Sequence, residues 1–201
     1  MKTIAILASG NGTNAENIVR AIQKKKLRAR LAFIFSNRRD AKVIERAKKL
    51  NVPYLCFEVK DFDSREEYEA VLLKQLKREK VDVIVLAGYM LLLGDKLIQT
   101  FKNRIINIHP SLLPSFKGTH AIQDAFNYGV RVSGVTVHFV APELDSGPII
   151  LQKEVPLLDG ERVSDFEKRI HEVEYELYPK ALQLVIEGKC KIKGRKVIIT
   201  K

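Results

Sequence analysis

The clearest sign of the fold is the opening stretch Ile4-Ala5-Ile6-Leu7-Ala8-Ser9-Gly10-Asn11-Gly12-Thr13-Asn14. Its first five residues are apolar on both faces, which is typical of a strand buried inside a parallel sheet. The glycines permit a tight turn, and a helical pattern then runs from about residue 15 to residue 26. A buried strand, a glycine-rich turn and a helix are the usual start of an α/β fold, and such a turn can bind a phosphate at the helix N-terminus.

This turn matches neither of the common nucleotide-binding motifs. It lacks the third glycine of the dinucleotide fingerprint, because residue 15 is Ala, and it lacks the Gly-Lys-Ser/Thr of a P-loop. A tight turn that binds no ligand is therefore the alternative to a phosphate site.

The alternation of strands and helices continues through the first half of the chain. Apolar runs at residues 31–35, 53–57 and 81–87 are predicted strands, and helical patterns occupy residues 41–50 and the segment that begins at Ser64. Ser64 with Glu67 is a capping-box pattern, which marks a helix start. Apolar strands joined by helices predict a parallel sheet covered on both faces.

The pattern changes after about residue 105. A strand at 105–109 ends in polar residues, runs at 130–140 and 149–155 predict an antiparallel hairpin, and a helix follows at 163–187, kinked or restarted at Pro179. A short β-pair turns at residues 193–195. We therefore expect a single α/β domain over residues 1–201, with an open, twisted, mostly parallel, Rossmann-like sheet, an added antiparallel hairpin and a long C-terminal helix.

The composition and charge of the chain limit the classes of function that fit it. The 201 residues include 35 basic and 24 acidic side chains, a net charge of +11, and 46% are hydrophobic. The uninterrupted apolar runs are shorter than the ~18 residues of a membrane span. The two cysteines, Cys56 and Cys190, are far apart, which predicts free thiols in the cytoplasm, and the spacing of histidines and cysteines predicts no metal site. Basic charge alone allows either a nucleic-acid partner or a small anionic substrate, and the chain has no aromatic-interleaved basic motif.

The most informative stretch is Asn107-Ile108-His109-Pro110-Ser111-Leu112-Leu113-Pro114. Asn107 and His109 are two residues apart on a predicted strand, so their side chains lie on the same face. Open α/β sheets bind ligands at the carboxyl ends of their strands. An amide beside an imidazole can hold an oxyanion and move a proton, as acyl transfer requires. The alternative is a hydrogen-bonded pair that only ends a strand.

Asp145 lies in the turn of the predicted hairpin. A turn aspartate usually bonds its own backbone, but a carboxylate beside a histidine raises the pKa of the ring and fixes its tautomer. The chain has no Gly-x-Ser-x-Gly motif and neither cysteine has a nearby base, so a covalent acyl-enzyme is not expected. Among the other histidines, His120 is expected in a loop and His138 as a packed strand residue. His171 and Glu174, three residues apart on one helix face, are expected as a surface contact rather than a binding site.

Together these segments resemble the folate-dependent formyltransferase family, which uses 10-formyltetrahydrofolate. The glycine-rich loop resembles the branch of the family that formylates phosphoribosylglycinamide (GAR). The resembling segments span nearly the whole chain in order. They are residues 9–14, 35–37, 85–90, 107–114 and 143–148.

The resemblance implies transfer of the formyl group of 10-formyltetrahydrofolate to the primary amine of GAR in de novo purine biosynthesis. The amine attacks directly and a tetrahedral intermediate forms. Asn107 donates a hydrogen bond to its oxyanion, and His109, held protonated by Asp145, stabilises the charge and takes part in proton transfer. The resemblance also implies a cis peptide at Leu113-Pro114, and it makes about 1–100 the phosphate-binding half and about 101–201 the catalytic and folate-binding half.

The resemblance further assigns the substrate contacts. The ribose phosphate is expected at Gly12, Thr13 and Asn14, and the glycinamide arm at His171 and Glu174. The pterin is expected in an apolar slot between residues 90–93 and the turn 140–145, with Arg65 near the glutamate tail. Many relatives have Arg where this chain has Leu91, which removes one cationic contact. The expected folate contacts are Arg65, Met90, Leu91, Leu92, Leu93, Val140 and Leu144.

Three alternatives remain. Methionyl-tRNA formyltransferase shares the expected trio but usually adds a C-terminal β-barrel domain, for which thirteen residues after the last helix are too few. Formyltetrahydrofolate hydrolase normally carries an N-terminal regulatory domain, whereas here the first strand begins at once. A non-catalytic phosphate- or RNA-binding module would not need Asn107, His109 and Asp145 to converge.

We expect a cytoplasmic monomer or homodimer whose partners are small molecules, with no nucleic acid, no membrane and no metal.

Overall fold

Four parallel strands form the first unit of the computed structural model, which describes residues 1–200. The chain divides into two compact units, Met1–Ile106 and Asn107–Lys201. Across the first sheet the order is β3 (Tyr54–Cys56), β2 (Ala29–Ser36), β1 (Lys2–Ala8) and β4 (Val83–Leu86). β1 pairs in parallel with β2 and with β4, and Ile4 to Ala8 are fully buried, as their apolar run predicts.

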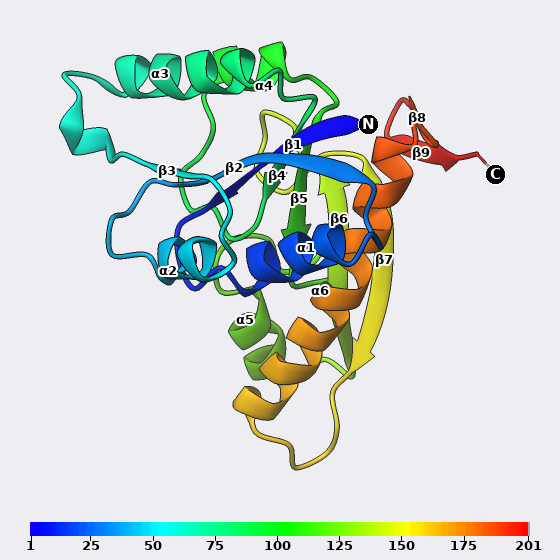
Figure 1. Ribbon diagram of the computed structural model, residues 1–201. Coiled ribbons are helices and arrows are strands. Elements are labelled where there is room, and N and C mark those ends of the chain that lie inside the picture. Colours follow the sequence, from blue (N-terminus) through cyan, green and yellow to red (C-terminus); the bar gives the residue numbers. More distant parts are fainter. Residues whose placement is uncertain (201) are drawn as a thin grey trace. The chain divides into compact units, whose positions relative to one another are not determined.

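Helices connect these strands. They are α1 (Thr13–Gln23), α2 (Lys42–Lys49), the 3₁₀ turn η1 (Val59–Asp61), α3 (Arg65–Arg78) and α4 (Asp95–Thr100). The Ser64 hydroxyl accepts a hydrogen bond from the Glu67 N–H at 3.1 Å, which confirms the predicted cap of α3. In Figure 1, α1 and α2 lie together on one side of β1 and β2, and α3 lies on the other side, so the sheet is covered on both faces. The sequence predicted neither η1 nor α4.

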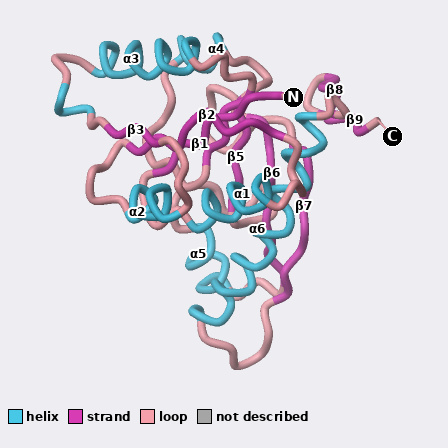
Figure 2. The backbone as a smooth tube through the Cα atoms, viewed as in Figure 1, coloured by secondary structure: helices cyan, strands magenta, loops and turns pink. Residues whose placement is uncertain are grey.

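The second unit is built around an antiparallel hairpin. β5 (Ile105–His109) enters it, and α5 (Ala121–Tyr128), β6 (Val132–Phe139), β7 (Ile149–Pro156) and α6 (Val163–Ile186) follow. β6 pairs with β7 antiparallel, and the C-terminal pair β8 (Cys190–Lys193) and β9 (Lys196–Ile199) joins this sheet through a parallel contact of β9 with β7. Figure 2 shows α6 running beside β6 and β7 as one continuous helix, so Pro179 does not interrupt it.

In the first unit, β1, β2 and β4 run parallel, so Ser9, Asn37 and Gly88, which follow them, lie at one edge of the sheet. In the second unit the peptide bond Leu113-Pro114 is cis, as expected.

Among residues 1–200, no helix is long and apolar enough to cross a membrane. Nor does this described part of the chain contain a group of three His, Cys, Asp or Glu side chains that could hold a metal ion.

Candidate active site

Four polar side chains of the second unit meet in what we call the polar cluster, namely Asn107, His109, His138 and Asp145. Asp145 lies in the turn between β6 and β7 and faces two imidazoles. Its Oδ2 is 3.5 Å from His109 Nδ1, and its Oδ1 is 3.8 Å from His138 Nε2. Asn107 Nδ2 donates to His138 Nε2 at 3.3 Å. The histidines and Asp145 are buried and Asn107 is half-buried, so these groups interact in surroundings of low dielectric constant.

Both ring nitrogens of His109 face acceptors. Nε2 donates to the carbonyl of Phe116 at 2.8 Å, and Nδ1 faces the Asp145 carboxylate. A neutral imidazole has only one N–H, whereas the imidazolium has two. With an acceptor beside each ring nitrogen, the ring of His109 is held in one orientation.

The turn that carries Asp145 is held in place by its backbone. Asp145 has a φ of 48°, in the left-handed region, and its Oδ2 accepts the N–H of Gly118 at 3.0 Å. Two residues on, a side chain at Gly147 would collide with the carbonyl of Phe139, so only glycine lets the turn approach β6 this closely. Backbone groups therefore hold the Asp145 carboxylate in position. The Gly118 N–H donates to it, and the close approach of Gly147 to Phe139 fixes the turn that carries it.

His138 is the member of the polar cluster that the sequence did not identify. The prediction that it is a packed strand residue is correct about its burial, since it is 2% exposed. Its Nδ1 donates to the Phe139 carbonyl at 2.9 Å, and burial lowers the pKa of His138, so the ring is uncharged near neutral pH. Nε2 is then a lone-pair acceptor for the Asn107 amide, which fixes the orientation of that amide. The one available signal was its position on the strand that leads into the Asp145 turn.

In the first unit, the β1 loop (residues 9–14) is clamped by α2. Arg46 Nε donates to the carbonyl of Asn11 at 2.7 Å, Arg46 Nη2 donates to Asn11 Oδ1 at 2.9 Å, and Arg46 Nη1 pairs with Glu16. Gly12 has a φ of 75°, and a side chain there would collide with Val43. The loop is therefore rigid where the first turn of α1 presents backbone N–H groups, the arrangement that binds an anion.

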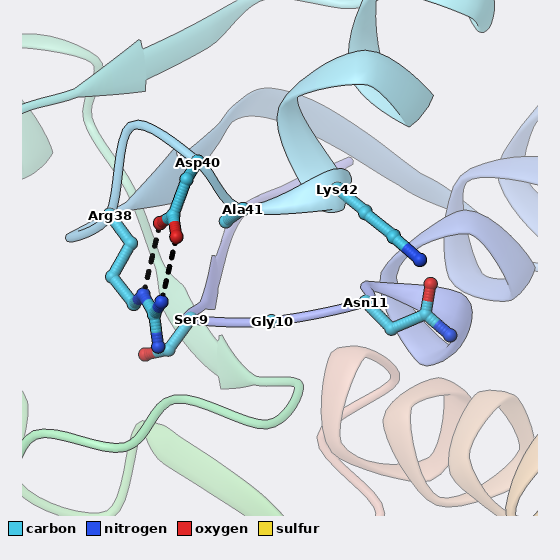
Figure 3. Close-up of a pocket in the computed structure, with 7 residues that line it drawn as sticks. All are labelled: Ser9, Gly10, Asn11, Arg38, Asp40, Ala41 and Lys42. Carbon is cyan, nitrogen blue, oxygen red and sulfur yellow. Dashed lines mark hydrogen bonds and ion pairs between the residues drawn. The ribbon is translucent and has the colours of Figure 1, made fainter.

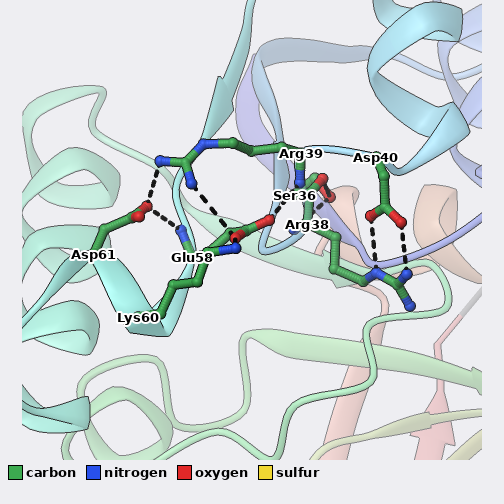
Figure 4. Close-up of polar contacts among 7 residues, drawn as sticks. All are labelled: Ser36, Arg38, Arg39, Asp40, Glu58, Lys60 and Asp61. Carbon is green, nitrogen blue, oxygen red and sulfur yellow. Dashed lines mark hydrogen bonds and ion pairs between the residues drawn. The ribbon is translucent and has the colours of Figure 1, made fainter.

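A hollow of about 330 Å³ lies beside the β1 loop. Its lining residues are Ser9, Gly10, Asn11, Arg38, Asp40, Ala41 and Lys42. Figure 3 shows Lys42 extending toward Asn11, while Arg38 is paired with Asp40 at 2.8 Å. Arg39 points elsewhere and pairs with Asp61 at 2.7 Å (Figure 4).

Comparison with known proteins places this geometry in a family. Residues 2–182 match the family described as Formyl transferase. The chain belongs to the formyl transferase family. The phosphoribosylglycinamide formyltransferase of Bacillus subtilis is 41% identical over 186 residues, 92% of this chain and 95% of that protein. That of Haemophilus influenzae is 40% identical over 193 residues, 96% of this chain and 91% of that protein.

Solved structures of similar fold point to the same family. The crystal structure of glycinamide ribonucleotide transformylase 1 from Symbiobacterium toebii matches this formyl transferase with a TM-score of 0.97 at 42% identity, covering 100% of this chain and 95% of that one. The predicted fold class, a mostly parallel open α/β sheet with an antiparallel hairpin and a long C-terminal helix, is confirmed. The resemblance to the GAR formyltransferase branch is confirmed as well.

The pair on α6 is more than a surface contact. His171 Nδ1 and Glu174 Oε2 are 2.8 Å apart, and the hydrogen bond to Glu174 raises the pKa of His171. Glu174 is only 4% exposed, whereas the His171 side chain is 38% exposed. The interpretation from the residues alone, a surface contact, is therefore wrong for Glu174, which is buried. A buried carboxylate beneath a partly exposed imidazole is an arrangement that can bind a polar ligand.

The residues expected to bind folate lie in both units. In the β4 loop (residues 88–93) of the first unit, Met90 and Leu92 are each 63% exposed, while Leu91 and Leu93 are half-buried. In the second unit, Val140 is half-buried and Leu144 is exposed.

Arg65 braces the β4 loop. Its guanidinium donates to the carbonyl of Leu92, and Glu69 accepts the N–H of Gly94 at 2.9 Å. Arg65 is thus already engaged with the protein backbone, which its expected contact with a glutamate tail would have to share or replace.

Proposed function

We propose that this formyl transferase transfers the formyl group of 10-formyltetrahydrofolate to the primary amine of GAR, a step of purine biosynthesis. The relatives in Bacillus subtilis and Haemophilus influenzae, named for that reaction, support the proposal through identities of about 40% over nearly the whole chain. The observation that carries it is the polar cluster, in which one carboxylate faces two imidazoles and one of these imidazoles orients an amide.

The cluster supplies what direct acyl transfer needs. The GAR amine attacks the formyl carbon, a carbon–nitrogen bond forms, and the carbonyl oxygen becomes negative. The Asn107 amide has a second N–H besides the one directed at His138, and we assign that N–H to the oxyanion. The charge of His109 also stabilises the oxyanion.

Collapse of the intermediate completes the reaction. The bond from the formyl carbon to the folate nitrogen breaks, and we assign to that nitrogen the Nε2 proton of His109, which is now donated to Phe116. The proton lost by the attacking amine replaces it. The products are formyl-GAR and tetrahydrofolate, and no covalent bond to the protein is required.

Substrate contacts follow the expected assignments. We assign the GAR phosphate to Gly12, Thr13 and Asn14. At these residues the β1 loop, which Arg46 holds in place, leads into the first turn of α1. We assign the glycinamide arm to His171 and Glu174, and the pterin to the exposed apolar side chains of the β4 loop and to Val140 and Leu144. Residues 1–100 thus carry the phosphate site and residues 101–201 the catalytic groups.

One assay separates this function from its nearest alternatives. The protein is mixed with 10-formyltetrahydrofolate, and loss of the formyl donor is followed with and without GAR. We expect loss only when GAR is present, with formyl-GAR formed in equal amount. Equal loss without GAR would make the protein a hydrolase, and no loss in either case would leave a binding module.

Replacing Arg46 with methionine is expected to raise the KM for GAR by about tenfold with little change in kcat, because charge-assisted hydrogen bonds of ~1.5–3 kcal/mol each fix Asn11. Steady-state kinetics with each substrate varied in turn measures this change. The matched control is Arg20→Met, which removes an arginine paired with the same Glu16 carboxylate at 2.7 Å. Equal KM values for GAR in the two variants would contradict the assigned role of the β1 loop.

Replacing His138 with phenylalanine is expected to lower kcat by about fivefold, since an orienting hydrogen bond contributes ~1 kcal/mol. The His138→Gln variant keeps an acceptor near Nε2 and is expected to retain most of the activity. Initial rates at saturating substrate, together with thermal melting of both variants, test this. If the two substitutions lower kcat equally, His138 does not act by orienting Asn107.

A further inference from the structure

The hydroxyl of Ser9 joins loops that follow three different strands of the first unit. Ser9 ends β1 and is 3% exposed. Its Oγ donates to Asn37 Oδ1, after β2, at 2.6 Å, and it accepts the backbone N–H of Met90, after β4, at 2.8 Å. The Ser9 N–H in turn donates to the carbonyl of Gly88 at 2.9 Å. One side chain thus connects the start of the β1 loop to the β4 loop.

The β4 loop is braced at both ends. Ser9 holds its beginning through Gly88 and Met90, and Glu69 holds the residue that follows its end through the N–H of Gly94. Of the two exposed apolar side chains, Met90 belongs to the residue that Ser9 holds by its N–H, and Leu92 lies between Met90 and Gly94. Fixing the backbone on both sides of an exposed apolar segment reduces the conformational entropy that the segment would lose on binding a ligand.

We propose that Ser9 is a positioning residue for the formyl donor, acting through the backbone of Met90. The proposal rests on the proposed function, because it takes the β4 loop as part of the donor site. Asn37 fixes the hydroxyl hydrogen, which leaves an oxygen lone pair for the Met90 N–H. Although Ser9 adjoins the loop assigned to the phosphate of GAR, its loss is therefore expected to weaken binding of the folate more than binding of GAR.

Ser36 offers a matched control. It ends the neighbouring strand β2, is 1% exposed, and also donates one hydrogen bond and accepts one. Its Oγ donates to the carbonyl of Arg38 at 3.0 Å and accepts the Arg38 N–H at 3.2 Å, so both bonds stay within its own loop (Figure 4). Ser9→Ala and Ser36→Ala thus remove equally buried hydroxyls that make equal numbers of bonds, but only the first breaks a bond between loops.

The test compares these two variants in the full-length enzyme. Calorimetry with tetrahydrofolate gives Kd, kinetics gives kcat and both KM values, and thermal melting reports stability. Ser9→Ala is expected to raise the Kd for tetrahydrofolate and the KM for the donor by about tenfold, with kcat within about threefold. Ser36→Ala is expected to leave both affinities within about twofold. The same small change in both variants would overturn the proposal, because a merely structural serine would act alike at either strand end.

The experiment also covers two other outcomes: a Ser9→Ala variant that does not fold, and a failure of the proposed function itself. If Ser9→Ala does not fold, Asn37→Ala replaces it, and a rise of about threefold in the Kd for tetrahydrofolate is expected, since the hydroxyl loses its orientation but not its acceptor. An unchanged Kd in Asn37→Ala would then count against the proposal. Wild-type enzyme that binds tetrahydrofolate without formylating GAR would contradict the proposed function alone. Wild-type enzyme that binds no tetrahydrofolate would overturn the role of Ser9 as well.

Discussion

Replacing Asn107 with alanine is expected to lower kcat by about 10²- to 10³-fold, the usual effect of removing one oxyanion donor. The N–H of Asn107 that is assigned to the oxyanion gains its charged acceptor late, because the formyl oxygen becomes negative only as the amine attacks. The lost interaction therefore belongs to the transition state, and kcat should fall about as much as kcat/KM. The His138 lone pair that receives the Asn107 N–H would be left without this donor, which adds a small cost in stability.

Steady-state kinetics at saturating GAR and donor measures the effect of Asn107→Ala. Thermal melting shows whether the variant is folded at the assay temperature. Asn127→Ala, which removes an exposed amide on α5, is the control for loss of an asparagine in the same unit. Turnover of Asn107→Ala within tenfold of the wild type would exclude this amide as the oxyanion donor.

Replacing His109 with alanine is expected to lower kcat by at least about 10²-fold, since general acid–base groups typically contribute 10²- to 10⁴-fold. His109 is held between the carboxylate of Asp145 and the carbonyl of Phe116. Without it, the cation near the oxyanion and the proton for the departing folate nitrogen are both lost. Asp145→Asn keeps the size of the side chain but removes its charge, so we expect a decrease in the same direction.

His120→Ala is the control for His109, because it removes an exposed imidazole from the segment that leads into α5. Its effect on kcat is expected to be small. If His109→Ala retains turnover within tenfold of the wild type, the acid–base assignment is wrong, whatever the geometry of the cluster. A normal kcat in Asp145→Asn would remove the carboxylate from the mechanism while leaving His109 in it.

The sequence predicted the regular parts of the fold because their signals are local. The apolar run of β1 and the cap at Ser64 each depend on a few neighbouring residues. Helix α4 was missed because its start depends on a distant contact, the Glu69 carboxylate that accepts the N–H of Gly94. Helix α5 was also missed, although it has the same length, eight residues, as the predicted helix α2.

In the candidate site too, the sequence predicted what depends on neighbouring residues and missed the contacts between distant residues. The two-residue spacing of Asn107 and His109 on a strand was enough to predict that they share one face. For Asp145 the residues alone left a turn aspartate and a partner of a histidine as alternatives, and the family resemblance favoured the second. His138 was missed because its hydrogen bond to Asn107 joins residues 31 positions apart. The clamp of Arg46 on Asn11 was missed for the same reason, since contacts between distant segments leave no pattern in a single sequence.

A single-turnover experiment with the donor labelled in its formyl carbon tests direct transfer by the polar cluster. Wild-type enzyme in excess over the donor is mixed with GAR and quenched at short times, and label is measured on GAR, on protein and as free formate. The account predicts that label moves to the GAR amine in one kinetic phase, with none bound to protein at any time. Label that first accumulates on the protein, or formate released at the same rate without GAR, would contradict it.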